Sequence, residues 1–220
     1  MARPRFKNLD EESRNRVLET AAVEFAARGF EGTSLNQLLD RLGMSKGSFY
    51  YYFDDKEDLF TTVVDHAWST LLPVEKLDLG TLDTTTFWPA LQSLLREARA
   101  RIHANPWLVG FSRLIYNPPE TVGVREALAH KFDEARRWQA GLILRGQEVG
   151  AVRSDLPAEL LQVILVGADE AGDRWMVENW ERFGEDEVER IVEEVFGIFR
   201  RMLELPPSGE ASPHHKGEIE

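Results

Sequence analysis

Apolar residues recur at helical spacing along almost the whole chain, and this repeat is the strongest constraint on the fold. One stripe runs from Val17 to Phe25 and another from Val188 to Met202, with apolar side chains three or four positions apart. The sequence has no sustained alternation of apolar and polar residues, which would mark half-buried strands. The chain is therefore predicted to fold as an all-α protein.

The charge balance and the missing cysteine exclude several classes of protein. The 220 residues carry 26 basic and 38 acidic side chains, a formal net charge of −12, and no cysteine. A disulfide scaffold, a cysteine-ligated zinc site and thiol catalysis are therefore excluded. The acid excess argues against a surface covered with nucleic-acid contacts but leaves room for a small basic patch.

No uncharged apolar run approaches the roughly 18 residues of a membrane span, and the start of the chain lacks a secretory signal. We expect a soluble, cytoplasmic protein with no membrane association.

Glycine and serine divide the first 53 residues into three short helices. Gly29 is placed to end the first helix, because a glycine tolerates the positive φ of a helix C-cap. Ser34, with Gln37 three residues later, has the spacing of a capping box that opens the second helix. Gly43 ends that helix and Ser45 caps the third. Two short helices joined by so tight a turn have the outline of a helix-turn-helix.

The third helix and its flanks carry an unusual local composition. The segment from Arg41 to Phe53 contains two cations and no acid, and Lys56 follows at the start of the next helix, where phosphate is favoured. Three consecutive tyrosines, Tyr50 to Tyr52, cover about 300° of a helix at about 100° per residue. They cannot all face one core, so part of this helix is predicted to lie on the surface.

The run from Val17 to Phe60 closely resembles the DNA-binding domain of the TetR family of transcriptional regulators. The resemblance rests on Gly29-Phe30, Thr33-Ser34, Gly43, Ser45-Lys46-Gly47-Ser48, Tyr50, Tyr52-Phe53 and Lys56-Glu57-Asp58-Leu59. Beyond this run the likeness is limited to helical organisation and to the segment GAVRSDL at 150–156. The resemblance implies a regulator of transcription, most simply a repressor, and no enzyme.

Site residues are implied only where this sequence aligns with the family motif. Lys46, Ser48 and Tyr50 would face base edges, with Asn36 of the preceding helix, and Gly47 would let the helix approach the groove. The positions that would touch phosphates are Thr33, Ser34, Ser45, Tyr51, Tyr52 and Lys56. Lysine can donate to guanine O6 and N7, and a tyrosine ring can contact a thymine methyl. Phe49 and Phe53 would turn inward as core.

The resemblance also implies a division of the chain. Residues 1–58 would form a helix-turn-helix DNA-binding domain with a flexible amino-terminal arm. Residues 59–205 would form a larger helical domain that binds a small molecule and dimerises through its last two long helices. The tail, residues 206–220, is polar and rich in proline and glycine, so we expect it to be disordered. The expected partners are a palindromic double-stranded operator, a small-molecule inducer and a second copy of the chain.

The ligand-binding residues are predicted from composition rather than from a motif. All six tryptophans follow the DNA-binding segment, and a pocket could draw on Trp68, Trp107, Phe111, Trp138 and Trp175. Asp169 and Asp173, one helical turn apart, would give it a negative wall for a cationic ligand. Taken singly, each tryptophan is better explained as core, and the carboxylates as exposed or dimer-interface groups; it is their concentration after the DNA-binding segment that favours a pocket.

Two motifs for other chemistry are weaker. Gly43 to Gly47 matches the G-x-S-x-G nucleophile elbow, but a helix precedes it where that motif needs a strand. Glu126 and His130 are spaced i, i+4 rather than the i, i+3 of di-iron bundles. No catalytic residue, metal or cofactor is expected. The alternative is an all-helical enzyme or carrier whose amino-terminal helices are structural, and DNA binding separates the two hypotheses.

Overall fold

The computed structural model describes residues 2–71 and 77–205, and the predicted all-α fold is confirmed over these ranges. The α-helices are α1 (Pro4–Lys7), α2 (Glu11–Gly32), α3 (Leu35–Leu42), α4 (Lys46–Tyr52), α5 (Lys56–Leu71), α6 (Phe87–Ala104), α7 (Trp107–Tyr116), α8 (Val122–Glu148), α9 (Ala158–Asn179) and α10 (Glu185–Leu203). Short 3-10 turns, η2 (Leu79–Thr81) and η3 (Trp180–Arg182), lie between them. The tail predicted at 206–220 lies outside the described residues.

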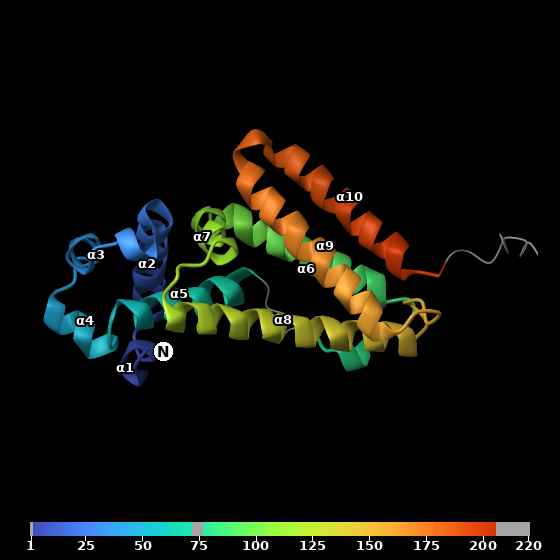
Figure 1. Cartoon of the computed structure of the whole chain (residues 1–220), viewed down its shortest axis with the longest axis horizontal. Coiled ribbons are helices and arrows are strands. Elements are labelled where there is room, and N and C mark those ends of the chain that lie inside the picture. The colour runs from blue at the N-terminus through green and yellow to red at the C-terminus, as the bar shows by residue number, and fades with distance from the viewer. Residues whose placement is uncertain (1, 72–76, 206–220) are drawn as a thin grey trace, which may run out of the picture.

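The helices form two groups joined by α5 (Figure 1). We call residues 2–55, with α1 to α4, the head, and residues 77–205, with α6 to α10, the body. Helix α5 leaves the head and packs against α8, the longest helix of the body. Helix α7 packs against α2 of the head and α9 of the body, so the two groups meet at α5 and α7.

The predicted stops in the head are confirmed, but one predicted start is wrong in detail. Gly29 has φ 71° and breaks the helical path within α2, and Gly43 has φ 62° at the end of α3. The hydroxyl of Ser45 accepts from the N–H of Ser48 at 3.1 Å and caps α4. Ser34 does precede α3, but its side chain makes no capping bond. The amide oxygen of Gln37 accepts instead from an arginine of α2, which draws it away from a capping box.

The amino-terminal residues are ordered against the head, where the sequence predicted a flexible arm. Phe6 in α1 is 1% exposed, and its ring lies 4.7 Å from that of Phe53, centroid to centroid. Ala2 is also buried, and its N–H donates to the hydroxyl of Thr62 in α5 at 3.2 Å. Burial of the Phe6 ring stabilises this segment by contacts with residues distant in sequence, which the local sequence does not show.

One large apolar cluster crosses the boundary predicted at residue 58. It contains the buried faces of α2 to α5 together with Leu108, Phe111 and Ile115 of α7 and Val124 and Leu128 of α8. Within it the ring of Phe60 lies 5.0 Å from Phe25 and 5.5 Å from Phe111. The head and the body therefore share a core, and α5 cannot move without moving side chains of both.

A second cluster holds the far end of the body together. Phe87 and Trp88 of α6 pack with Leu161 of α9 and Leu203 of α10. Pro89 lies in the first turn of α6, where the backbone N–H has no helical partner to lose.

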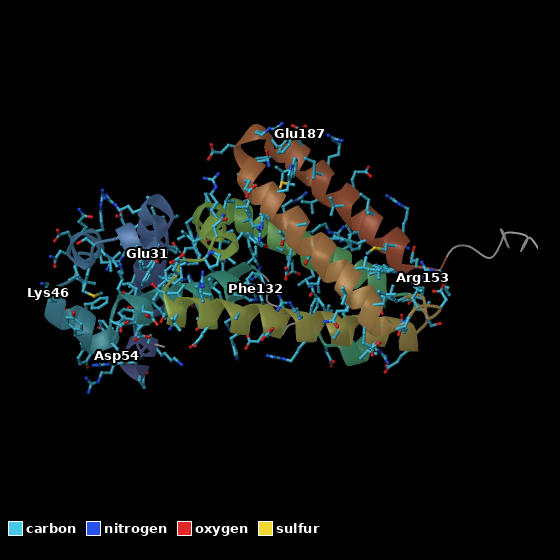
Figure 2. All side chains as sticks on the ribbon, in the orientation of Figure 1. Glu31, Lys46, Asp54, Phe132, Arg153 and Glu187 are labelled. Carbon is cyan, nitrogen blue, oxygen red and sulfur yellow. The ribbon has the colours of Figure 1, made fainter. Side chains whose placement is uncertain are left out.

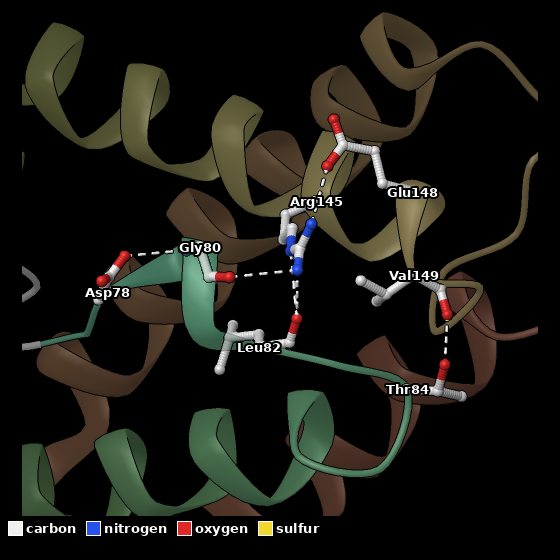
Figure 3. A network of polar contacts seen from close by, with 7 residues as sticks. All are labelled: Asp78, Gly80, Leu82, Thr84, Arg145, Glu148 and Val149. Carbon is white, nitrogen blue, oxygen red and sulfur yellow. Dashed lines mark hydrogen bonds and ion pairs between the residues drawn. The ribbon is translucent and has the colours of Figure 1, made fainter.

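Polar contacts fix the loops at this end of the body (Figure 3). The guanidinium of Arg145 in α8 donates to the carbonyl oxygens of Gly80 and Leu82 at 3.2 and 2.7 Å, and the hydroxyl of Thr84 donates to the carbonyl of Val149. In the loop of residues 150–156, the N–H of Arg153 donates to the carbonyl of Leu203 at 2.7 Å. That loop ties α8 to the end of α10.

No helix among the described residues is long and apolar enough to span a membrane.

Candidate functional site

Helix α4 has one buried and one exposed face, as the sequence predicted. Phe49 and Phe53 are 0% exposed and turn into the core of the head. Lys46 and Ser48 are exposed on the opposite side, and Figure 2 shows Lys46 at the outer edge of the head. A Cβ placed on Gly47 would meet only the Ser45 hydroxyl, at 3.8 Å, so the chain itself leaves room at this position.

The three tyrosines of α4 divide between surface and core. Tyr50 and Tyr51 are each 48% exposed. Tyr52 is partly buried, with its ring 5.8 Å from that of Phe6 in an edge-to-face arrangement. The outward face of α4 thus presents Tyr50 and Tyr51, while Tyr52 serves mainly to hold α1.

Two residues predicted to contact phosphates are engaged inside the protein. Thr33 is 1% exposed, and its hydroxyl donates to the carbonyl of Gly29 at 2.7 Å. The ammonium of Lys56 donates to the carbonyls of Phe30 and Thr33 at 2.6 and 2.9 Å and lies 4.4 Å from the centre of the Phe30 ring. Burial lowers the pKa of Lys56. Both side chains brace the end of α2 against the start of α5, and their contact with phosphate stays a prediction.

The remaining predicted DNA-contact residues lie on the exposed side of the head. Ser34 and Asn36 are exposed at the start of α3. The hydroxyls of Ser45 and Ser48 lie 2.9 Å apart and share one hydrogen bond. These four polar side chains and the outward face of α4 therefore form the candidate DNA-contact surface.

A buried carboxylate that the sequence reasoning missed joins α2 to α3. Glu24 is 8% exposed, and its oxygens pair with Arg28 at 3.2 Å and Arg41 at 3.3 Å. Arg41, one of the two cations between Arg41 and Phe53, therefore forms an ion pair within the head. The available signal was the position of Glu24, three residues after Ala21 on the buried side of the helix.

In the body, the structure brings the two predicted carboxylates together with two neutral donors. The Tyr116 hydroxyl of α7 donates to Asp173 at 2.9 Å, and the Gln139 amide of α8 donates to Asp169 at 3.2 Å. Burial, and next the charge of Asp173, raise the pKa of Asp169 to about 7. Desolvation by surrounding side chains also raises the pKa of Asp173. The nearby Arg136 pairs with other carboxylates, so neutral groups alone donate to this pair within the described chain.

An aromatic row leads from α5 to these carboxylates. The ring of Trp68 lies 5.5 Å from that of Phe132 in an edge-to-face arrangement, and Tyr116 lies 6.4 Å from Phe132 on the other side. Figure 2 shows Phe132 midway along the molecule on α8. The sequence reasoning missed Tyr116, Phe132 and Gln139, because their meeting depends on how three helices cross and no local pattern encodes it.

Two other predicted pocket residues belong to the shared core. Trp107 stacks on His66 with centroids 5.5 Å apart and rings inclined by 4°. Phe111 is 0% exposed and packs on Phe60. Both lie at the junction of head and body rather than beside the carboxylate pair.

The last two predicted residues lie apart from the aromatic row. Trp138 packs against the second apolar cluster. Trp175 is 47% exposed, and its ring lies 5.7 Å from that of Phe183. The structure thus gathers Trp68, Asp169 and Asp173 into one region and distributes the other four predicted residues elsewhere.

A family model described as bacterial regulatory proteins, tetR family, matches residues 17–63. The transcriptional repressor AcnR of Corynebacterium glutamicum is 42% identical over 158 residues, which cover 70% of this chain and 76% of that protein. The transcriptional repressor KstR2 of Rhodococcus jostii is 26% identical over 205 residues, covering 92% of this chain and 93% of the relative.

Solved structures share the fold. A TetR family regulator from Chloroflexus aurantiacus has a TM-score of 0.61 at 22% identity, covering 94% of this chain and all of the other. The fatty acid degradation regulator FadR of Bacillus halodurans has a TM-score of 0.70 at 14% identity, over 84% of this chain and 97% of the other.

A helix-turn-helix head on a helical body defines the class as a DNA-binding transcriptional regulator. The chain belongs to the TetR family. It is a DNA-binding transcriptional repressor and not an enzyme, which removes the alternative of an all-helical enzyme or carrier. As a bacterial transcription regulator, it is a cytoplasmic protein.

Proposed function

We propose that this repressor is a homodimer that contacts a palindromic operator through α4 and is released by a small apolar or cationic inducer. The observation that carries the proposal is the two-sided character of α4. Phe49 and Phe53 anchor one face in the core, while Lys46, Ser48 and Tyr50 stand exposed on the other. Side chains held this rigidly can reach base edges with a defined register.

The test is the base preference of Lys46→Ala on duplexes that the wild-type protein selects from a random-sequence library. Loss of a lysine that donates to a guanine should cost about 1 to 3 kcal/mol and relax preference at one base pair of each half-site. Arg137→Ala is the control, because it removes one exposed cation from α8, away from the head. An unchanged base preference in Lys46→Ala would contradict the role of α4.

An exposed apolar face on α9 and α10 supports the homodimer. Val163 is 69% exposed and Ile198 is 55% exposed. Gly167 and Gly172 continue the surface of α9, and a Cβ on either would meet nothing within 4 Å. Helices with small residues can approach closely, and a two-fold pairing of α9 and α10 would form a four-helix bundle. Such a dimer would set two α4 helices one DNA turn, about 34 Å, apart.

Gly172→Arg tests this assembly. A long charged side chain on the apolar face should yield monomers in sedimentation and weaken operator binding, because only one half-site is then held. Glu126→Arg puts the same side chain on an exposed position of α8 and should leave the assembly unchanged. A dimer of normal stability in Gly172→Arg would place the interface elsewhere.

We further propose that the inducer binds beside Asp169 and Asp173, against the aromatic row of Trp68, Phe132 and Tyr116. Burial, and then the charge of Asp173, raise the pKa of Asp169 to about 7, so a cation bound beside the pair would stabilise its ionised form. The FadR of Bacillus subtilis was solved with stearoyl-CoA. A polyanion of that kind is disfavoured here, since its phosphates would be repelled by the carboxylates.

Tryptophan fluorescence titrations with matched cationic and neutral aromatic compounds test the ligand class. Asp173→Asn should weaken cationic compounds far more than neutral ones, because it removes a charge and leaves the apolar contacts in place. Asp133→Asn, an exposed carboxylate of α8 that pairs with Arg136, is the control. Equal affinities of wild type and Asp173→Asn for every compound would remove the support for a cationic ligand.

A further inference from the structure

The amino-terminal turn is attached to the end of α4 by one arginine. The backbone N–H of Arg3 donates to the carbonyl of Tyr52 at 2.9 Å, and its guanidinium donates to the carbonyl of Tyr50 at 2.7 Å. These carbonyls belong to the last turn of α4 and have no partner within the helix. The guanidinium also pairs with Asp54 at 2.6 Å. Arg3 is therefore neutralised, and its donors are used to hold residues 2–7 against α4.

Arg5, two residues further on, is placed differently. Its guanidinium carbon lies 4.6 Å from the centre of the Tyr51 ring, and both residues are exposed. Within the described chain no carboxylate pairs with Arg5 and no carbonyl accepts from it. A guanidinium stacked on a ring keeps its N–H donors in the plane, directed away from the stack. Such a group is oriented for an anion outside the protein.

We propose that residues 2–7 are part of the DNA-binding surface and that Arg5, oriented by Tyr51, binds a phosphate of the operator backbone beside α4. The segment lies outside residues 17–63, which the family model matches. A planar guanidinium suits a phosphate because it can donate two parallel hydrogen bonds. In a chain of net charge −12, a cation held without a carboxylate next to α4 favours a polyanion as its partner. The proposal rests on the proposed role of α4.

The experiment compares Arg5→Ala with Lys7→Ala, which removes the same charge from the same helical turn without touching the Tyr51 stack. Binding is measured against salt concentration on a duplex selected by the wild-type protein and on a scrambled duplex. Loss of one phosphate contact should make the slope of log K against log salt shallower by about 0.9 per bound protomer. Arg5→Ala should weaken both duplexes by the same factor, because a phosphate contact carries no sequence information.

Phosphate ethylation of the selected duplex locates the contact. Ethylation of one phosphate per half-site should impair binding of wild type and Lys7→Ala but no longer affect Arg5→Ala. Arg5→Lys should retain most of the slope, since it keeps the charge. Thermal unfolding of Arg5→Ala should match wild type, because the side chain is exposed.

The outcomes separate this proposal from the role of α4. Lys46→Ala can lose base preference while Arg5→Ala keeps the wild-type salt slope and ethylation pattern. In that case the role of Arg5 is overturned, and the proposed contact of α4 with base edges is retained. If Arg5→Ala and Lys7→Ala lose the same slope, the effect is general electrostatic attraction and the proposal is again overturned. If Lys46→Ala keeps its base preference while Arg5→Ala loses the slope and the ethylation effect, the base-reading role of α4 is overturned and the phosphate contact of Arg5 is supported.

Discussion

The head and the body differ in how completely their inward-facing polar groups are paired. In the head, Glu24 has two arginine partners and the Thr33 hydroxyl has a carbonyl partner. The Lys56 ammonium, at the start of α5, donates to two carbonyl oxygens of the head. In the body and at its junction with α5, buried nitrogens of His66, Trp107 and Trp138 have no hydrogen-bond partner within the described residues. Buried nitrogens without a protein partner therefore lie at the junction and in the body.

The carboxylate pair of the body extends this difference. Burial and mutual repulsion make the ionised form of Asp169 unfavourable, which the raised pKa reports. A fully paired network such as that of the head makes its arrangement specific, whereas a partly paired one lowers the cost of change. This difference suits a rigid DNA-contacting head attached to a body that a ligand can rearrange, because a ligand shifts the equilibrium only by its differential affinity.

The shared core should make head and body unfold together, and Phe60→Ala tests this with the largest expected effect. Phe60 is 0% exposed, and its ring contacts Phe25 and Phe30 in the head and Phe111 in the body. Truncation should lower the free energy of unfolding by about 3 to 5 kcal/mol, because it leaves a cavity among rings of both groups. Urea unfolding followed by far-UV circular dichroism measures it.

A single transition at lower urea is expected for Phe60→Ala. Two separate transitions in the wild-type protein would show that head and body are stabilised independently, and the comparison would then describe two domains rather than one coupled core.

Lys56→Met has the next largest effect and tests whether polar pairing stabilises the head. The substitution removes a charged donor from two carbonyls and should cost about 1.5 to 3 kcal/mol of stability. Lys46→Met is the matched control, because Lys46 is exposed on α4 and should change stability little. If the two variants have equal stability in thermal unfolding, the hydrogen bonds of Lys56 do not stabilise the head.

The parts of the head that sequence alone predicted are those encoded locally. Gly29 and Gly43 mark helix ends because positive φ is costly for other residues, and Ser45 marks a start because its side chain can cap α4. The burial of Phe6 against Phe53 was not predictable in this way, since it joins residues far apart in sequence. The inward turn of Lys56 depends on where α2 ends in space and was missed for the same reason.

The body was predicted less completely because its contacts are between helices. Composition showed that tryptophans gather after the head, and the spacing of Asp169 and Asp173 placed them on one face of α9. Neither pattern says which aromatic rings meet. Trp68 reaches Phe132, while Trp175 remains at the surface, and only the crossing of α5, α8 and α9 decides between them.

The smallest expected effect is the pH dependence of stability conferred by Asp169. Its pKa of about 7 in the folded protein exceeds the ordinary value of 3.8, through burial and then the charge of Asp173. Between these values the folded chain holds a proton that the unfolded chain releases. The stability that protonated Asp169 contributes is therefore fully present below about pH 4 and is lost as the pH rises through about 7. Asp169→Asn removes the ionisation, so its stability relative to wild type should increase across that interval and level off above it.

Urea unfolding of both proteins at a series of pH values measures this difference. The effect is expected to be small because Asp169 keeps part of its surface in water, which screens the neighbouring charge. The groups around it are Gln139 of α8 and Glu170 and Asp173 of α9. Glu126→Gln is the control, because Glu126 is exposed on α8 and is not among the groups that shift the pKa of Asp169. If wild type and Asp169→Asn differ by the same amount at every pH, Asp169 is ionised as in water, and the carboxylate pair no longer distinguishes the body from the head.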